Sequence, residues 1–237
     1  MKIDVAFLPR DIEGRDLSET VCIVLDIFRA TTTITTAIAN KCRAIFPVLS
    51  VEDAHKLREQ IGPASFAGER QSITIPGFDF GNSPYEFSPD KVQDKTIIMT
   101  TTNGTVAIKA TEGAFRTLIG SFINAQAVCR EAQKHGKDVI IVCAGTDRLF
   151  SLEDALCAGL MVKLMSEKHT EMTDAAQSAV LMYNQAQDNL TNVAISSRNG
   201  KRLYDLDKLA DVEYCFRTDI LNIVAEYKDS KITFCEK

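Results

Sequence analysis

The sequence predicts an α/β protein with helices on both faces of a β-sheet. Two observations carry this prediction: short apolar runs typical of strands alternate with segments of helical spacing, and β-branched residues fill the apolar runs. The chain has 237 residues, of which 45% are hydrophobic and 25% charged, an ordinary globular composition. Its length allows one large domain or two small ones.

The first part of the chain reads as strands and helices in turn. Residues 3–7 alternate between apolar and polar side chains, which indicates a half-buried strand. Residues 21–27 are almost continuously apolar, which indicates a strand buried on both faces. The helix that follows opens at threonines and stops near Asn40. The next predicted elements are a strand at 43–48, a helix at 50–62 between Ser50 as N-cap and Gly62, and a strand at 64–69.

Residues 69–95 change character. They contain three prolines and two glycines and show no helical period. We therefore predict a long loop, and a loop of this length inside a compact domain is usually functional.

The order of elements then repeats. An apolar strand, a threonine cluster, a short helix, a strand, a helix and a strand follow one another between residues 95 and 147, as they do between 21 and 70. Either a duplication or a chance likeness of generic α/β units explains these two pseudo-repeats. From residue 151 the chain becomes helical, with further helical segments at 172–196 and 203–219 and closing strands at 220–227 and 230–236.

Charge and composition exclude several classes of partner. The net charge of −5 and the lack of a clustered basic patch argue against nucleic-acid binding. No apolar run approaches 18 residues, so we expect no membrane span, and the start of the chain has no signal-peptide pattern. The seven cysteines lie mostly in apolar runs without a C-x-x-C motif, which favours reduced thiols and a cytoplasmic location. The oligomeric state stays open, a homo-oligomer included.

Polar residues cluster where four predicted strands end. Ligands of open α/β sheets bind beyond the carboxyl ends of strands, so these clusters are the candidate site. They comprise Asp26 and Arg29 with Thr31, Thr32 and Thr33; Glu69 with Arg70; Thr100, Thr101, Thr102, Asn103, Gly104 and Thr105; and residues 145–148 with Ser151, Glu153 and Asp154.

These residue types suit a phosphate monoester. Helix N-termini, hydroxyls and arginine donate hydrogen bonds to phosphate oxygens. Carboxylates cannot touch a phosphate dianion directly, so several of them beside it imply a hard cation, and Mg²⁺ is held by one or two carboxylates with water and substrate oxygens. The sequence therefore predicts a magnesium-assisted phosphate site.

Structural alternatives exist for most of these residues. The threonines can be plain helix caps, Asp154 can form a capping box with Ser151, and Glu153 can simply complement a helix dipole. Asp26 is harder to explain structurally except as a salt bridge to Arg29, because an unpaired buried charge is costly. Spacing excludes other phosphatase chemistries: C-x5-R, D-x-D after the first strand and the P-loop are all missing.

Motifs spread along the chain resemble the 2-phosphosulfolactate phosphatase family, which is associated with coenzyme M biosynthesis. They are "LDIFRATTTI", "AGER", "GFDFGNSP", "MTTTNGT", "CAG" with "SLEDALCAG", and "SRNG" through "DVEYCFRTD". The resemblance implies a magnesium-dependent hydrolase that converts 2-phospho-3-sulfolactate to 3-sulfolactate and phosphate. It also implies one three-layer α/β/α domain with a mixed sheet over residues 1–237.

Carried over to this chain, the resemblance points to the same clusters and adds the "GNSP" loop. We expect Asp26, Glu69 and a carboxylate of the Glu153–Asp154 pair to hold the metal. We expect phosphate to bind to Arg29, Thr31, Thr32, Thr33, Thr101, Thr102, Asn103, Gly104 and Thr105. Arg70, Asn82 and Ser83 are the candidates for the sulfonate and carboxylate, with Asp26, Arg29 and Glu69 as the catalytic group. Asp219 also matches a family position, without a role derivable from the sequence, and residues 187–202 look divergent.

Two choices remain open at this level. Attack by metal-activated water is favoured over a transient aspartyl-phosphate on Asp26. The alternative functions are a phosphatase for another small phosphorylated hydroxy acid and a non-catalytic sensor of such an anion.

Overall fold

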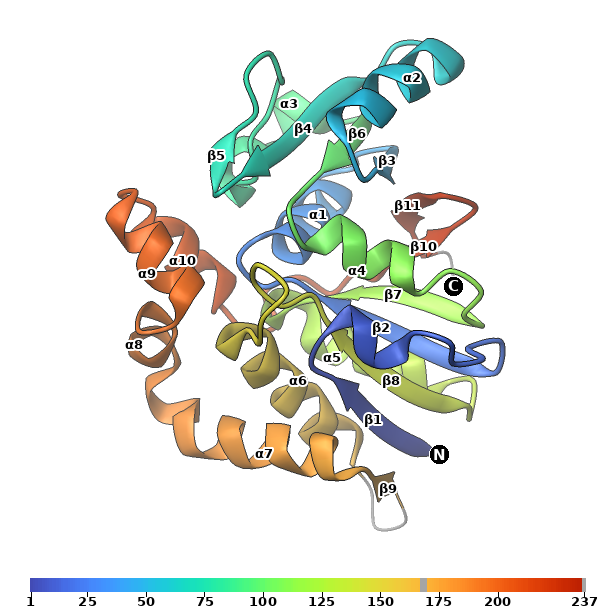
Figure 1. Cartoon of the computed structure of the whole chain (residues 1–237), viewed down its shortest axis with the longest axis vertical. Coiled ribbons are helices and arrows are strands. Elements are labelled where there is room, and N and C mark those ends of the chain that lie inside the picture. The colour runs from blue at the N-terminus through green and yellow to red at the C-terminus, as the bar shows by residue number, and fades with distance from the viewer. Residues whose placement is uncertain (167–169, 236–237) are drawn as a thin grey trace.

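A computed structural model describes residues 1–166 and 170–235, and within them eleven strands form one mixed sheet (Figure 1). The strands are β1 Lys2–Ala6, β2 Thr20–Leu25, β3 Ala44–Pro47, β4 Ser65–Arg70, β5 Ile73–Thr74, β6 Thr96–Thr100, β7 Arg116–Gly120, β8 Asp138–Cys143, β9 Glu171–Met172, β10 Ala225–Lys228 and β11 Lys231–Phe234. Their order in the sheet is β5-β4-β6-β3-β11-β10-β7-β2-β8-β1-β9. The predicted α/β class and mixed sheet are confirmed.

Helices connect these strands. The α-helices are α1 Ala30–Ala39, α2 Val51–Ile61, α3 Pro89–Val92, α4 Gly104–Ala110, α5 Ala125–Gln133, α6 Leu152–Met165, α7 Asp174–Ala186, α8 Leu190–Ile195, α9 Arg198–Asp205 and α10 Leu209–Cys215. The 3-10 helices are η1 Pro9–Ile12, η2 Pro84–Glu86, η3 Phe122–Asn124 and η4 Gln187–Asn189. None of the helices in the described ranges is long and apolar enough to cross a membrane.

The sheet consists of two parallel groups joined by a hairpin. Strands β4, β6 and β3 are parallel to one another, as are β7, β2, β8 and β1. The β10–β11 hairpin pairs antiparallel with β7 on one side and with β3 on the other, so the two groups run in opposite directions. Five strand pairings separate β6 from β2, and a twist of about 20–25° at each adds up to roughly 100–125°. This twist turns the carboxyl ends of the two groups toward one another.

The two predicted pseudo-repeats exchange their first strands. The first unit runs β2–α1–β3–α2–β4 and the second β6–α4–β7–α5–β8. Strand β2 lies between β7 and β8 of the second unit, and β6 lies between β4 and β3 of the first. Both units therefore contribute loops to one site. Their origin by duplication stays a prediction, as does the single-domain assignment.

Helices cover both faces of the sheet, which gives the expected three layers. On one face, α5 and α6 pack over the β7–β2–β8–β1 group with Ile23, Ile141 and Phe122 in a large core. On the other face, α1 packs over the β3–β6 region with Ile34 and Ile97, and α2 covers the opposite side of that region through Ala54. Helices α8, α9 and α10 form a separate group, drawn in orange at the left of Figure 1.

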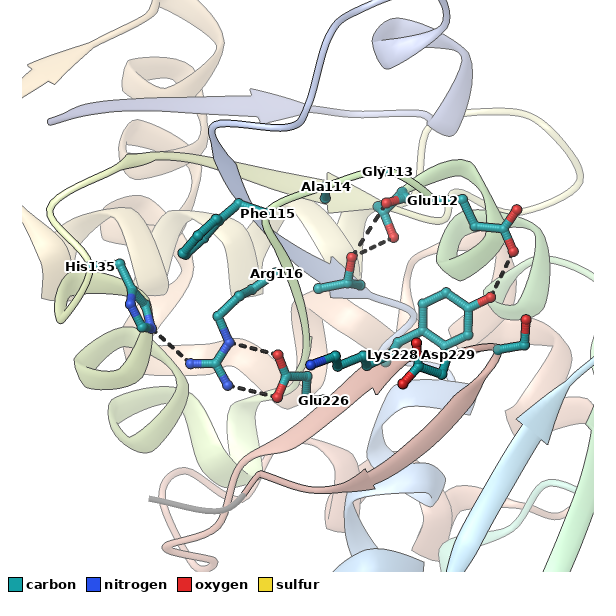
Figure 2. A pocket seen from close by; sticks show the side chains of 13 residues that line it. Glu112, Gly113, Ala114, Phe115, Arg116, His135, Glu226, Lys228 and Asp229 are labelled. Atoms are coloured by element: carbon teal, nitrogen blue, oxygen red, sulfur yellow. Dashed lines mark hydrogen bonds and ion pairs between the residues drawn. The ribbon is translucent and has the colours of Figure 1, made fainter.

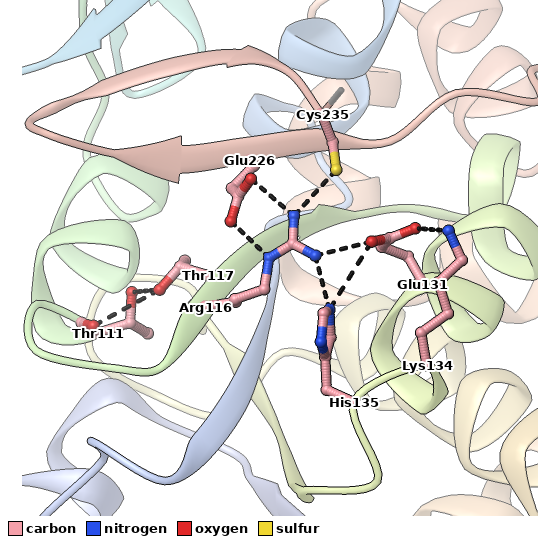
Figure 3. Close-up of polar contacts among 8 residues, drawn as sticks. All are labelled: Thr111, Arg116, Thr117, Glu131, Lys134, His135, Glu226 and Cys235. Atoms are coloured by element: carbon pink, nitrogen blue, oxygen red, sulfur yellow. Dashed lines mark hydrogen bonds and ion pairs between the residues drawn. The ribbon is translucent and has the colours of Figure 1, made fainter. Parts of the chain in front are cut away.

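Arg116 at the start of β7 ties the hairpin to the rest of the sheet (Figure 3). Its Nε and Nη2 atoms donate to the two carboxylate oxygens of Glu226 in β10 at 2.6 and 2.7 Å. Its Nη1 atom donates to Glu131 in α5 at 2.7 Å, and His135 Nε2 lies 2.7 Å away. Because Arg116, Glu131 and Glu226 are largely buried, the cluster fixes β10 and α5 against β7.

The sequence predictions differ from the structure mainly in the long loop and near the C-terminus. Residues 69–95 contain β5, η2 and α3 rather than loop alone. The helical segment expected at 172–196 divides into α7, η4 and α8. The segment expected at 203–219 divides into α9 and α10, and α9 begins earlier than predicted, at Arg198. The two closing strands are confirmed as β10 and β11, although Glu236, at the end of the predicted second strand, lies outside the described residues.

Candidate active site

A narrow polar cavity of ≈ 10 Å³ lies where the loops after β2, β4 and β6 meet. Its walls come from both parallel groups of the sheet and from α9. The residues that line it are Asp26, Phe28, Arg29, Glu69, Ser72, Asn82, Thr102, Asn103, Asn199 and Arg202. The structure thus brings together residues from four segments that the sequence analysis singled out separately.

A second, larger cavity of ≈ 590 Å³ contains none of the predicted site residues (Figure 2). It lies beside the start of β7 and the β10–β11 turn, and its lining includes Phe115, Arg116 and Lys228. Arg116 is already bound to Glu226 within it. We therefore locate the candidate site at the smaller cavity, where the uncommitted polar groups are.

Asp26 is the central acid of this site. Its side chain is buried, and Oδ1 accepts a 3.3 Å hydrogen bond from the Ala30 amide at the start of α1. Burial and the charges of Glu69 and Glu153 raise the pKa of Asp26 to about 7. A negative charge at this position is therefore short of compensation, which is the condition that favours a bound cation.

Gly104 allows α4 to approach Asp26 closely. A Cβ atom at this position would lie 2.7 Å from Asp26 Oδ2 and 2.6 Å from the Cβ atom of Ala30. Both distances are shorter than van der Waals contact. The glycine predicted to contact phosphate thus serves to bring the start of α4 against the acid.

Two threonines fasten the loops after β2 and β6 in the same way. The Thr31 hydroxyl accepts from the Asp26 amide and donates to the Asp26 carbonyl, both at 3.0 Å. The Thr105 hydroxyl accepts from the Thr101 amide at 3.3 Å and donates to the Thr101 carbonyl at 3.0 Å. Each threonine is the second residue of its helix. The two pseudo-repeats therefore share one junction geometry.

Two carboxylates, Asp154 at the start of α6 and Glu69 at the end of β4, hold these junctions. Asp154 accepts from the Ile27 amide at 2.8 Å, and Glu69 accepts from the Thr102 amide at 2.8 Å. The other oxygen of Asp154 accepts from the Gly145 amide at 3.1 Å. Glu69 and Asp154 thus make the same kind of contact at the two junctions, but only Glu69 lines the cavity.

The four predicted metal ligands do not all meet. In the parts of the chain that the structure describes, no three His, Cys, Asp or Glu side chains are grouped closely enough to hold a metal ion. Asp26 and Glu69 line the cavity, whereas Glu153 and Asp154 do not. Burial raises the pKa of Glu153. Hydrogen bonds from the side chains of Ser197, Ser151 and Asn199 act in the opposite direction and lower that pKa. Burial also raises the pKa of Asp154, aided by the charges of Glu153 and Asp26.

The residues around Asp26 and Glu69 fit Mg²⁺. Three buried oxygens near them have no hydrogen-bond partner, namely Asn82 Oδ1, Thr102 Oγ1 and Asn199 Oδ1. All three residues line the cavity. Two carboxylates and neutral oxygens are the kinds of ligand that Mg²⁺ prefers.

Arg29 is held in place by an acid that the sequence analysis did not name. Its guanidinium is 1% exposed and forms an ion pair with Asp211 of α10. It also donates to the Ser72 carbonyl at 3.2 Å. Ser83, predicted to bind substrate, instead donates to the other oxygen of Asp211 at 2.6 Å. Asp211 opens the "DVEYCFRTD" motif, so its place in that motif was the available signal.

The hydroxyls of the first threonine cluster point into the protein rather than toward a ligand. Thr32 donates to the Ile27 carbonyl at 3.2 Å, and Thr33 donates to the Asn82 carbonyl at 2.9 Å. With Thr31 bound to Asp26, all three hydroxyls are used by the backbone, and the residues are fully buried. These hydroxyls are thus engaged within the protein, and the assignment of the three threonines to phosphate stays a prediction.

The residues of the second threonine cluster, 101–105, have two different surroundings. The Thr101 hydroxyl accepts from the Thr105 amide at 3.1 Å, and the Thr105 hydroxyl bonds to the Thr101 backbone. The hydroxyls of Thr101 and Thr105 are thus both engaged at the start of α4. Thr102 keeps a free hydroxyl at the cavity. Asn103 also lines the cavity, and its Oδ1 accepts from the Asp147 amide at 3.1 Å.

Two further residues lie away from the cavity. Arg70 is exposed, and its guanidinium donates to the Glu69 carbonyl at 2.7 Å and to the Thr100 hydroxyl at 3.0 Å. Asp219 accepts from the amide of Gln126 at 2.7 Å at the start of α5. Asp219 is therefore a helix-capping residue.

Helix α9 adds residues that the sequence analysis passed over as divergent. Asn199 donates to the Phe28 carbonyl at 2.6 Å and presents its other amide atom, Oδ1, without a partner. Arg202 forms a 2.7 Å ion pair with Asp147. Ser197 accepts from the Gly200 amide at 3.0 Å and so starts the helix. The only advance signal was this Ser-x-x-Gly helix start within "SRNG".

Comparisons with known proteins agree with the resemblance. The family model described as 2-phosphosulpholactate phosphatase matches residues 6–230. A protein of Clostridium acetobutylicum is 40% identical over 98% of this chain and 100% of its own length. One of Clostridium kluyveri is 41% identical over 100% and 99%, and one of Carboxydothermus hydrogenoformans is 40% identical over 95% and 93%. Each of the three is named "Probable 2-phosphosulfolactate phosphatase".

Proposed function

Because the chain belongs to the 2-phosphosulpholactate phosphatase family, we propose that it hydrolyses 2-phospho-3-sulfolactate to 3-sulfolactate and phosphate. This makes it a phosphoric monoester hydrolase. The observation that supports the proposal most strongly is the cavity that gathers Asp26, Glu69 and Arg29 with unpartnered amide and hydroxyl oxygens. Arg29 and the Thr102 hydroxyl can donate to the oxygens of a phosphorylated acid, whereas the carboxylates and the amide oxygens can hold a cation beside it.

We assign Mg²⁺ binding to Asp26 and Glu69. When bound, the ion would offset phosphate charge and lower the pKa of a coordinated water. Glu153 and Asp154 are better explained as buried carboxylates that shape the loops around Asp26, since both oxygens of Asp154 bind backbone amides. The sequence also predicts one carboxylate of the Glu153–Asp154 pair as a ligand, which this assignment leaves out.

The protein's own groups orient the substrate. Arg29 is immobilised by Asp211 and by the Ser72 carbonyl, so its remaining donors have a fixed direction. Thr102 and the amide groups of Asn82 and Asn199 offer neutral hydrogen bonds at the same cavity. Groups held in this way need little reorganisation during the reaction.

The reaction that we propose is a direct displacement. The oxygen of water forms a bond to phosphorus as the ester P–O bond breaks, and a proton from water passes to the leaving oxygen, which becomes the hydroxyl of sulfolactate. The rival route places a transient phosphoryl group on Asp26. Single-turnover hydrolysis of a substrate chiral at phosphorus separates the two, because direct attack inverts configuration and the rival route retains it.

A substrate panel tests the proposed function. Purified protein with Mg²⁺ is assayed for phosphate release from 2-phospho-3-sulfolactate, 2-phospholactate and phosphoglycolate. We expect the highest kcat/KM for the sulfonate. A preference for another phosphorylated hydroxy acid would establish the alternative substrate, and binding without release would establish a sensor.

The cellular setting follows from the proposed reaction. We place the protein in the cytoplasm, since its cysteines are buried core thiols. We place its reaction in coenzyme M biosynthesis, with which the family is associated. The expectations that it binds no nucleic acid and is free to form a homo-oligomer stay predictions.

A further inference from the structure

The cavity contains two arginines with very different surroundings. Arg29 is buried, and Asp211 already compensates its charge. Arg202 is 29% exposed at the side chain and reaches the cavity from α9. Among the described residues that line the cavity, these two carry the only cationic side chains. A ligand with two separated anionic ends would meet one at depth and the other at the rim.

Asp147, the acid that pairs with Arg202, can readily be displaced by another anion. Asp147 Oδ2 lies 2.7 Å from Arg202 Nη2, and the Asp147 side chain is 41% exposed. An ion pair this exposed contributes little to stability, so replacing its acid by another anion costs little. Asp147 stays near the cavity because its amide donates to Asn103.

We propose that Arg202 is a specificity-determining residue that binds the sulfonate of the substrate, and that Asp147 occupies its guanidinium when no substrate is bound. This inference rests on the proposed function, since the sulfonate is the anion that distinguishes this substrate from other phosphorylated hydroxy acids. Phosphate then lies at the Asp26 and Glu69 end of the cavity. The guanidinium fork of Arg202 matches the planar spacing of two anionic oxygens.

The same helix supplies a matched control. Arg198, four residues earlier, is not among the residues that line the cavity, and its guanidinium donates to the Thr146 carbonyl at 3.3 Å. Arg198→Gln and Arg202→Gln therefore remove the same charge from one helix, but only the second removes a cavity residue. Equal melting temperatures of the two variants show that α9 is retained.

The test compares two substrates that differ in the sulfonate. For 2-phospho-3-sulfolactate we expect Arg202→Gln to raise KM about 10- to 100-fold with little change in kcat, the effect of losing a charged hydrogen bond. For 2-phospholactate we expect no change in KM. Arg198→Gln should leave both unchanged, and Asp147→Asn should lower KM for the sulfonate, because a competing carboxylate is removed.

The outcomes separate this inference from the proposed function. If the wild type releases no phosphate from 2-phospho-3-sulfolactate, the proposed function fails. If the wild type is active and Arg202→Gln has an unchanged KM, Arg202 does not bind the sulfonate. An equal rise in KM for both substrates would assign Arg202 to the carboxylate and overturn the inference.

Discussion

Replacing Asp26 by asparagine is expected to abolish activity and yet stabilise the fold. Asp26 is buried beside Glu69 and Glu153, and these surroundings raise its pKa from the ordinary value of 3.8 to about 7. The folded protein therefore binds this proton more tightly than the unfolded chain does. Between about pH 4 and pH 7 the folded state holds more protons, so stability falls as pH rises through that window and stays low above it.

The size of the effect follows from the pKa difference. Each pH unit is worth about 1.4 kcal/mol, so a shift from 3.8 to about 7 corresponds to roughly 4 kcal/mol at pH 8. Asparagine keeps the shape and the Oδ1 acceptor for Ala30 but carries no charge. Above pH 7 we therefore expect Asp26→Asn to be more stable than the wild type by about 2–4 kcal/mol, and near pH 4 to be equally stable.

Urea unfolding followed by circular dichroism measures this difference. Wild type, Asp26→Asn and the exposed control Asp188→Asn are compared at pH 4.5 and pH 8 in EDTA, which keeps divalent ions from masking the charge. The control should follow the wild type at both pH values. A loss of stability in Asp26→Asn of the same size at both pH values would refute the reasoning, because it would show that Asp26 contributes contacts rather than strained charge.

Four further substitutions have distinct expected results. Gly104→Ala should lower kcat about 100-fold, because its Cβ would displace Asp26, and should cost about 1–3 kcal/mol of stability measured by urea unfolding. Thr31→Val should cost about 1–3 kcal/mol, because it leaves buried backbone groups unpaired, whereas Thr102→Val should raise KM without lowering the melting temperature. Arg116→Gln should lower the free energy of unfolding by about 2–4 kcal/mol and leave KM unchanged. These assignments would be contradicted by normal kinetics in Gly104→Ala or by a changed KM in Arg116→Gln. They would also be contradicted if Thr102→Val had a normal KM and a lower melting temperature.

The order of strands and helices could be predicted from the sequence because each element has its own local pattern. Residues 21–27 are apolar on both faces, and Ser50 and Gly62 mark the ends of α2. The exchange of β2 and β6 between the two units could not be predicted, since it depends on pairings between distant strands. Local signals do not distinguish β2 beside β7 from β2 beside β3.

The candidate site was predictable to the level of residue clusters but not of individual atoms. Asp26, Glu69 and Thr102 do reach one cavity, as expected from their places at strand ends. The sequence cannot show whether a threonine hydroxyl turns toward the backbone, as that of Thr31 does, or toward a cavity. Arg202 was missed because its contribution depends on how α9 packs over loops from the first half of the chain.

Single-turnover hydrolysis of 2-phospho-3-sulfolactate tests the central claim most directly. Metal-stripped wild type and Asp26→Asn are each mixed in excess with substrate, with and without Mg²⁺, and phosphate and sulfolactate are quantified together. The account predicts equal amounts of both products from the wild type with Mg²⁺ and almost none in the other three mixtures. Full release without Mg²⁺, or by Asp26→Asn, would contradict it.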